Sequence, residues 1–311
     1  GQTITSVAGG EAFATDFRFG CIYDYQGLFL QQKADGIMGL SMKDNTFIAT
    51  LAAQQVIPTK AFSLCFALNG GTMALGGQAS HLHQEPMRYA KLEKGFSGWY
   101  KVTLQDIRMG GVSIGVSESV YNQERGIIVD SGTTDTYLPK DALEGFKSAF
   151  RVASGGMEYR EVLDLTALEI EALPDIEFLL QSHKDGEEAV SVVMKSHAYL
   201  ELWNRSLYTA IIFSERAILG ANFMRDHDVH FDWEGMKIGF AAADCAWSPG
   251  PGGEVGGSDG DGADDGGTDA HGYEGPGQGE GGEINSPSLA PSSATSLSWS
   301  PTPRPPLPLN L

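Results

Sequence analysis

The stretch "GIIVDSGTTDTYLP", residues 126 to 139, decides the fold class. Its opening residues Gly126 to Val129 are mostly apolar and β-branched, which predicts a short buried strand. That strand delivers one carboxylate, Asp130, into a Ser-Gly-Thr-Thr turn. A carboxylate at the end of an apolar strand is costly unless hydroxyls and backbone amides hold it or chemistry requires it. Asp130 is therefore either a buried structural acid or half of a catalytic site.

The composition of the whole chain narrows its class. With 311 residues, 41% of them hydrophobic, the chain can bury one or two substantial cores. Its formal charge of −19 argues against nucleic acid or an anionic membrane as a partner, because both are bound through basic patches. No apolar run approaches the roughly 18 to 20 residues of a membrane helix. We expect a monomeric globular protein with no membrane segment in this chain.

The last part of the chain, residues 248–311, differs in composition from the rest. It contains 10 of the 14 prolines and 15 of the 40 glycines, and it is strongly acidic. Such a segment cannot bury enough apolar surface to offset its ordering entropy, so we predict a disordered Gly/Asp/Ser/Pro-rich tail.

Residues 1–247 have the pattern of an all-β protein with a few short helices. Two hairpins are predicted, one around Asn69-Gly70 between "AFSLCFAL" and "TMALGG" and one around Glu234-Gly235. Helices are predicted in "NTFIATLAAQQ", with Asn45 as its cap, and in "PKDALEGFKSAF", which begins at Pro139 after the Asp130 turn.

One short signal occurs twice, as two apolar residues followed by Gly. The copies are Ile37, Met38 and Gly39 in "ADGIMGLS", and Ile218, Leu219 and Gly220 in "RAILGANF". Glycine at such a position suits a close approach between backbones. The two copies predict two similar lobes.

Five blocks in this order resemble the pepsin-like aspartic endopeptidases of the A1 type. They are "ADGIMGLS", "FSLCFALNGGTMALGG", "SGWYKVTLQDIRMGG", "IIVDSGTTDTYLP" and "AILGANFMRDHDVHFDWEGMKIGFAAADC". The resemblance covers nearly all of residues 1–247 and implies an all-β, bilobal acid-protease fold. It also implies hydrolysis of polypeptide substrates by a pair of aspartates that activate water, with no cofactor.

The resemblance assigns roles to residues around the Asp130 turn. Asp130 resembles the catalytic aspartate of the second lobe. Ser131 resembles the residue whose hydroxyl bonds across the aspartate pair, Gly132 lets backbone amides reach the carboxylate, and Thr133 resembles the hydroxyl that bonds its outer oxygen; Thr134 supports the same loop. The two apolar-apolar-Gly segments would support the two active-site loops from below.

The first aspartate of the pair has no counterpart in this sequence, because no second Asp-Thr-Gly or Asp-Ser-Gly occurs in it. We therefore interpret the chain as a fragment truncated at its N-terminus. Residues 1–92 would be the C-terminal part of the first lobe and residues 93–247 the second lobe. Two positions depart from the family pattern, Asp135 where an apolar residue is usual and Ala221 where many members carry Asp.

The sequence also allows a second function and raises the question of a metal site. A catalytically inactive pepsin-fold binding or inhibitor protein is the alternative function, and the residues upstream of Gly1 would discriminate the two. The histidines of "HLH" (81–83) and "HDVH" (227–230) lack zinc-ligand spacing, so we interpret them as structural or surface residues and predict no metal.

The cysteines and the only glycosylation sequon bear on the compartment. The chain contains Cys21, Cys65 and Cys245. The resemblance implies a disulfide between Cys65 and Cys245, whereas three reduced thiols remain the rival reading. Asn204 in "NRS" is the candidate glycan acceptor. Family resemblance and acidity together favour the secretory pathway, with a secreted or vacuolar/lysosomal protein.

Overall fold

The computed structural model describes residues 15–21, 24, 36–68, 70–94, 98–123, 126–203 and 206–246, together with the backbone of a strand at 295–299. These described residues belong to one compact unit. The described part of the chain is mostly β-strand arranged in four sheets, as the sequence predicted. The division into a first lobe ending at residue 92 and a second lobe ending at 247 stays a prediction.

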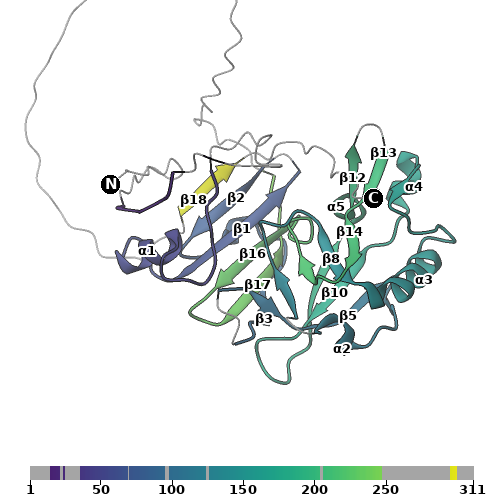
Figure 1. The fold of residues 1–311 in the computed structure, drawn as a ribbon, viewed down its shortest axis with the longest axis horizontal. Helices are drawn as coiled ribbons and strands as arrows, with labels where there is room; N and C mark the ends of the chain where they lie inside the picture. The colour runs from purple at the N-terminus through teal and green to yellow at the C-terminus, as the bar shows by residue number, and fades with distance from the viewer. Residues whose placement is uncertain are drawn as a thin grey trace, which may run out of the picture. The chain divides into compact units, whose positions relative to one another are not determined.

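The largest sheet is antiparallel and joins strands from distant parts of the sequence (Figure 1). Its order is β18 (Thr295–Trp299), β2 (Gly70–Leu75), β1 (Ala61–Ala67), β16 (His227–Asp232), β17 (Lys237–Ala242) and β3 (Arg88–Lys91). Both predicted hairpins are confirmed, because β1 pairs with β2 and β16 pairs with β17. The first hairpin turns one residue earlier than predicted, since Ala67 already pairs with Gly70.

Strand β18 lies within the segment predicted to be disordered. It pairs antiparallel with β2, from Thr295 opposite Leu75 to Trp299 opposite Gly71. The predicted disorder of residues 248–311 stays a prediction. Between Pro291 and Pro301 the tail has nine residues without Gly or Pro, its longest such stretch, and the average composition of the tail concealed it.

A second, five-stranded sheet carries the Asp130 turn. Its order is β14 (Ile211–Ser214), β8 (Thr136–Pro139), β15 (Ile218–Leu219), β7 (Ile127–Val129) and β4 (Lys101–Val102). β15 runs parallel to β7, and β14 runs parallel to β8. The segment Ile218–Leu219 thus lies between the two strands that enter and leave the turn.

Two smaller antiparallel sheets and several short helices complete the described structure. One sheet contains β11 (Val190–Met194), β10 (Ile176–Leu180), β5 (Leu104–Met109) and β6 (Val112–Ser113), and the other contains β12 (Leu200–Trp203), β13 (Ser206–Thr209) and β9 (Val162–Leu163). The helices are α1 (Phe47–Ala53), α2 (Glu118–Tyr121), α3 (Leu143–Ala153), α4 (Ala167–Glu171) and α5 (Ser196–Tyr199), with short 3₁₀ turns η2 (Ser80–Leu82) and η3 (Lys140–Ala142).

Both predicted helices form, but each begins later than predicted. The first is capped by Thr46, whose hydroxyl accepts from the amide of Ala49, and not by Asn45. The second begins at Leu143, because Pro139 ends strand β8 and a 3₁₀ turn follows it. Phe146 and Phe150 of this helix are fully buried, as its apolar spacing indicated.

The core packs against one face of the large sheet. Phe62 of β1 stacks on Phe231 of β16 with 4.7 Å between ring centroids, and Tyr100 meets Phe231 edge-on. Alternate residues of β16 point to opposite faces, so Val229 and Phe231 face this core while Asp228 and His230 face the other side. Among the described residues, no helix is both long and apolar enough to cross a membrane.

Candidate active site

Asp130 follows the last residue of β7, and its own loop holds its carboxylate. Oδ1 accepts a hydrogen bond from the backbone N–H of Gly132 at 2.9 Å, and Oδ2 accepts one from the hydroxyl of Thr133 at 2.7 Å. The side chain is partly buried, so one side of the loop remains open to solvent. Two donors on two different oxygens fix the plane of the carboxylate, which is what a general acid or base requires.

Strand β15 supports this loop from below. The backbone N–H of Asp130 donates to the carbonyl of Leu219 at 3.0 Å, and Leu219 is completely buried. Gly220 follows at the point of closest approach, where a Cβ atom would lie 2.2 Å from the carbonyl oxygen of Asp135 and 2.7 Å from that of Thr133. The close backbone approach predicted for this glycine is therefore present in the structure.

The two residues after Gly220 form backbone hydrogen bonds with the second half of the Asp130 loop. The amide of Ala221 donates to the carbonyl of Thr133 at 2.7 Å, and the amide of Asn222 donates to that of Thr134 at 3.0 Å. The Asn222 side chain is buried, accepts from the Thr136 hydroxyl at 2.8 Å, and donates to the Ala210 carbonyl at 2.8 Å. The sequence analysis missed Asn222, although a single amide inside the apolar run "ILGANFM" was a usable signal.

The first apolar-apolar-Gly segment has a different environment. Ile37 is 63% exposed and Met38 is 47% exposed, and neither lies in a strand. A Cβ atom on Gly39 would meet nothing within 4 Å. This segment supports no loop within the described part of the chain, and its supporting role stays a prediction.

The remaining predicted loop residues differ in their exposure. Ser131 and Thr134 are partly buried, and Gly132 is exposed. Asp135, one of the two departures from the family pattern, is buried immediately before β8 and raises the pKa of the Tyr159 phenol as a minor contribution beside burial of that ring. The catalytic role of Asp130 and the supporting roles of its neighbours stay predictions.

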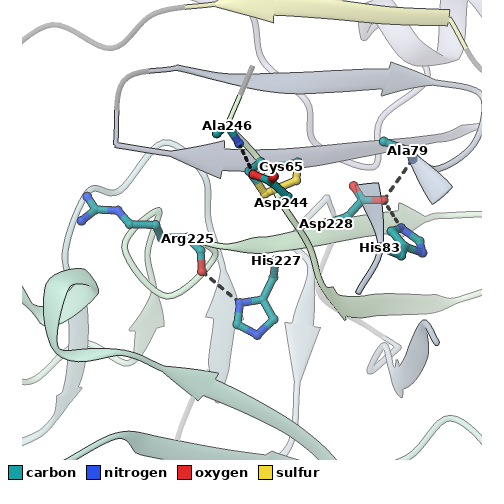
Figure 2. Close-up of a disulfide and its surroundings, with 9 residues drawn as sticks. Cys65, Ala79, His83, Arg225, His227, Asp228, Asp244 and Ala246 are labelled. Carbon is teal, nitrogen blue, oxygen red and sulfur yellow. Dashed lines mark hydrogen bonds and ion pairs between the residues drawn. A yellow bond between two sulfur atoms is a disulfide. The ribbon is translucent and has the colours of Figure 1, made fainter. Parts of the chain in front are cut away.

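The disulfide predicted from the resemblance is confirmed. Cys65 of β1 and Cys245, which follows β17, are joined with an S–S distance of 2.03 Å (Figure 2). Both cysteines are buried, whereas Cys21 is a free, exposed thiol. The bond connects positions 180 residues apart in the sequence. It therefore closes most of the described chain into one covalent loop.

Of the histidines near this disulfide, His227 and His230 are buried and His83 is partly buried. His83 Nε2 lies 2.7 Å from Oδ2 of the fully buried Asp228, which also accepts from the Ala79 amide (Figure 2). Burial lowers the pKa of both His227 and His230 below the ordinary value. Of the two interpretations given for them from the sequence, structural or surface, their burial favours the structural one. Within the described ranges, no three His, Cys, Asp or Glu residues are grouped as metal ligands would be.

The glycan acceptor proposed from the sequence, Asn204, lies outside the described residues. Its use therefore stays a prediction.

Residues 4–243 match the family model described as eukaryotic aspartyl protease. This match covers most of the chain, and the chain belongs to that family. Its sequence is similar to those of nepenthesin-2 from Nepenthes gracilis (33% identical over 141 residues, 42% of this chain and 31% of the relative) and a beta-secretase from Strongylocentrotus purpuratus (30% over 198 residues, 56% and 36%). It is also similar to renin-2 from Mus musculus (26% over 230 residues, 69% and 55%). The chain thus spans only about a third to a half of the length of these curated relatives.

Proposed function

We propose that Asp130 is one carboxylate of a two-aspartate centre that hydrolyses peptide bonds in polypeptide substrates. The observation that carries the proposal is the geometry of the Asp130 loop, in which Gly132 and Thr133 donate to the two carboxylate oxygens and β15 supports the turn. Membership of the aspartyl protease family supports the same reaction class.

The chemistry proposed for this centre needs two adjacent carboxylates that share one proton. The ionised member removes a proton from water, which attacks the peptide carbonyl, and the protonated member donates to the carbonyl oxygen. Two adjacent carboxyl groups do not both ionise readily, because their negative charges repel each other. One proton therefore stays on the pair. Asp130 is partly exposed, so water can reach it.

In this proposal the second carboxylate comes from residues outside the 311-residue sequence, because that sequence contains a single Asp-Thr/Ser-Gly triplet. We therefore expect the 311-residue chain to fold but not to catalyse the hydrolysis of peptide bonds. A product of the same gene that includes the sequence encoded upstream of Gly1 is expected to be active at acidic pH.

The test compares Asp130→Asn with Asp141→Asn in that longer gene product. Asp141 is an exposed acid on the 3₁₀ turn after β8, so its substitution removes one nearby charge without touching the loop. Cleavage of an unfolded polypeptide is expected to fall by roughly 10³-fold or more in Asp130→Asn, because a neutral amide cannot share the proton. Activity in Asp141→Asn is expected to stay near wild type.

Two results would contradict the proposal. One is wild-type turnover in Asp130→Asn with the fold intact by circular dichroism. The other is robust, pepstatin-sensitive cleavage by the 311-residue chain alone, which would mean that a partner carboxylate exists within it.

The single triplet also supports a second candidate function, a binding or inhibitor protein built on the same fold. The two candidates predict different residues upstream of Gly1. A second Asp-Thr/Ser-Gly after an apolar strand supports the peptidase, and any other residue at the aspartate position supports the binding protein.

We further propose that the protein acts as a monomer in the secretory pathway, secreted or in a vacuole or lysosome. A disulfide between buried cysteines suits an oxidising compartment. Family membership supports the same assignment.

A further inference from the structure

The face of the large sheet that points away from the aromatic core carries polar side chains on its two central strands. Ser63 of β1 is the direct cross-strand partner of His230 of β16, and Asp228 lies two positions before His230 on the same face. Ser63 and Asp228 have no exposed surface, and His230 is 8% exposed. Polar groups this deeply buried are costly unless they form hydrogen bonds.

Each of these three side chains has one buried polar atom without a hydrogen-bond partner among the described residues. The atoms are Ser63 Oγ, Asp228 Oδ1 and His230 Nε2. The other oxygen of Asp228, Oδ2, accepts from the Ala79 amide at 3.0 Å and lies 2.7 Å from His83 Nε2 (Figure 2). Both contacts of this carboxylate therefore fall on one oxygen, and the lone pairs of Oδ1 are unused.

The hydrogen bonds of Tyr89 determine what the free nitrogen of His230 can do. The Tyr89 hydroxyl has a single hydrogen, which it donates to Gln78 Oε1 at 3.3 Å. His230 Nδ1 lies 3.2 Å from the same hydroxyl oxygen, so Nδ1 carries the ring proton and donates it. Burial lowers the pKa of His230, which keeps the ring neutral at neutral pH. Nε2 is then a hydrogen-bond acceptor.

Two acceptors and one hydroxyl in this arrangement match the hydrogen-bonding capacity of one water molecule. Directly opposed residues of an antiparallel pair have Cβ atoms about 5 Å apart, and residues two positions apart on a strand are about 7 Å apart. A water at hydrogen-bond distance from all three side chains fits within these spacings. It would donate to Asp228 Oδ1 and His230 Nε2 and accept from the Ser63 hydroxyl. Buried waters typically make about three such bonds.

We propose that Ser63, Asp228 and His230 form an internal binding site for one water molecule, which bridges β1 and β16 on the face opposite the aromatic core. Ala79 and His83, which contact the other oxygen of Asp228, belong to the connection between β2 and β3. The water thus completes the hydrogen-bond network that holds this connection against the sheet. This inference does not depend on Asp130 or on peptidase activity.

The first test is a high-resolution crystal structure of the 311-residue chain at neutral pH. We expect one ordered water about 2.7 to 3.2 Å from Ser63 Oγ, Asp228 Oδ1 and His230 Nε2. Ser63→Val replaces the hydroxyl by two methyl groups and should displace this water. Thr136→Val also removes a buried hydroxyl, but from a different sheet, and is the matched control that should keep it.

The second test is nitrogen NMR of the His230 ring in solution, with its signals assigned by their loss in His230→Gln. We expect the ring proton on Nδ1, and an Nε2 resonance upfield of that of a free imine nitrogen because Nε2 accepts a hydrogen bond from the water. In Ser63→Val the Nε2 resonance should move downfield, toward the free value. In Thr136→Val it should not move.

Three results would overturn the proposal. Absence of ordered density at this position in the wild-type crystal, with the three side chains oriented as described, would show that no water binds there. A ring proton on Nε2 of the wild-type protein would show that this nitrogen is a donor. An Nε2 resonance that is the same in wild type and in folded Ser63→Val would show that no displaceable molecule bonds to the ring. The first two measurements use the wild-type protein and decide the matter even if Ser63→Val fails to fold.

Discussion

The two apolar-apolar-Gly segments have nearly the same sequence and opposite environments. Ile218-Leu219-Gly220 forms β15 between β7 and β8, where Leu219 has no exposed surface and Gly220 lies against two backbone carbonyls. Ile37-Met38-Gly39 has no regular structure and exposes about half or more of both apolar side chains. A three-residue pattern therefore becomes a buried strand only where flanking strands supply its hydrogen bonds and cover.

The strands that flank Ile218-Leu219-Gly220 are β7 and β8, which lie on either side of the Asp130 loop. β7 enters the loop and β8 leaves it, so the strands that bury Leu219 are the same ones that carry the proposed catalytic residue. The same contacts therefore support the Asp130 loop and bury Leu219. Substitutions at the covered segment should therefore cost more stability than their counterparts at the exposed one.

The largest difference is expected for the central apolar residue. Leu219→Ala should lower the free energy of unfolding by about 3 to 4 kcal/mol, because it leaves a cavity beneath the loop. Met38→Ala should change it by no more than about 0.5 kcal/mol, since much of that side chain is already in water. Urea denaturation followed by fluorescence measures both, and equal losses would mean that the Met38 segment is covered in solution.

The glycines should differ by a smaller amount. Gly220→Ala places a methyl group against the carbonyls of Thr133 and Asp135, so we expect a loss of about 2 to 3 kcal/mol. Gly39→Ala has open space around it and should lie within about 0.5 kcal/mol of wild type. Thermal unfolding of the two variants tests this pair. A neutral Gly220→Ala would mean that the loop can move away from β15 without cost.

The residue two positions after each glycine gives a third comparison. Asn222→Leu removes the partner of the Thr136 hydroxyl inside the protein and should cost about 2 kcal/mol. Ser41→Ala, at the matching position after Gly39, should cost less than about 0.5 kcal/mol. A double-mutant cycle with Thr136→Val isolates the Asn222 hydrogen bond. A coupling energy of zero between positions 136 and 222 would mean that this hydrogen bond does not stabilise the Asp130 loop.

The smallest effect on the free energy of unfolding is expected from acidic pH. It should not alter the difference in stability between the covered and the exposed segment. Burial lowers the folded-state pKa of His227 and His230 below the ordinary value of 6.5, so their stabilising contribution is complete above that pH. As the pH falls below 6.5, the unfolded chain takes up protons first and stability decreases, by about 1.4 kcal/mol per histidine for each pH unit at most. Both residues belong to β16, so the gap between Gly220→Ala and Gly39→Ala should be the same at pH 5 and pH 7. Replacement of His230 by Gln should reduce the slope of stability against pH, and an unchanged slope would contradict this assignment.

Much of the local structure was predictable because it depends on neighbours in the sequence. The alternation in "AFSLCFAL" and "TMALGG" and the turn between them fixed the β1–β2 hairpin. The apolar run before Asp130 was enough to predict the strand, and the family resemblance implied the backbone amide that reaches the carboxylate. Errors occurred at element ends, such as the Thr46 cap and the late start of α3, where Pro139 completed a strand in place of opening a helix.

The sequence alone was enough to predict a mostly β-strand protein, its family, the strand before Asp130 and, through the family, the Cys65–Cys245 disulfide. Tertiary structure decided which copy of the repeated segment is buried, that Asn222 bonds across to Thr136, that His227 and His230 lie inside, and that residues 295–299 pair with β2. The physical reason is that these features depend on partners dozens to hundreds of positions away. A backbone amide, a histidine or an apolar pair carries the same local preferences in either environment, and only the strands that fold against it determine whether it is bonded, buried or exposed.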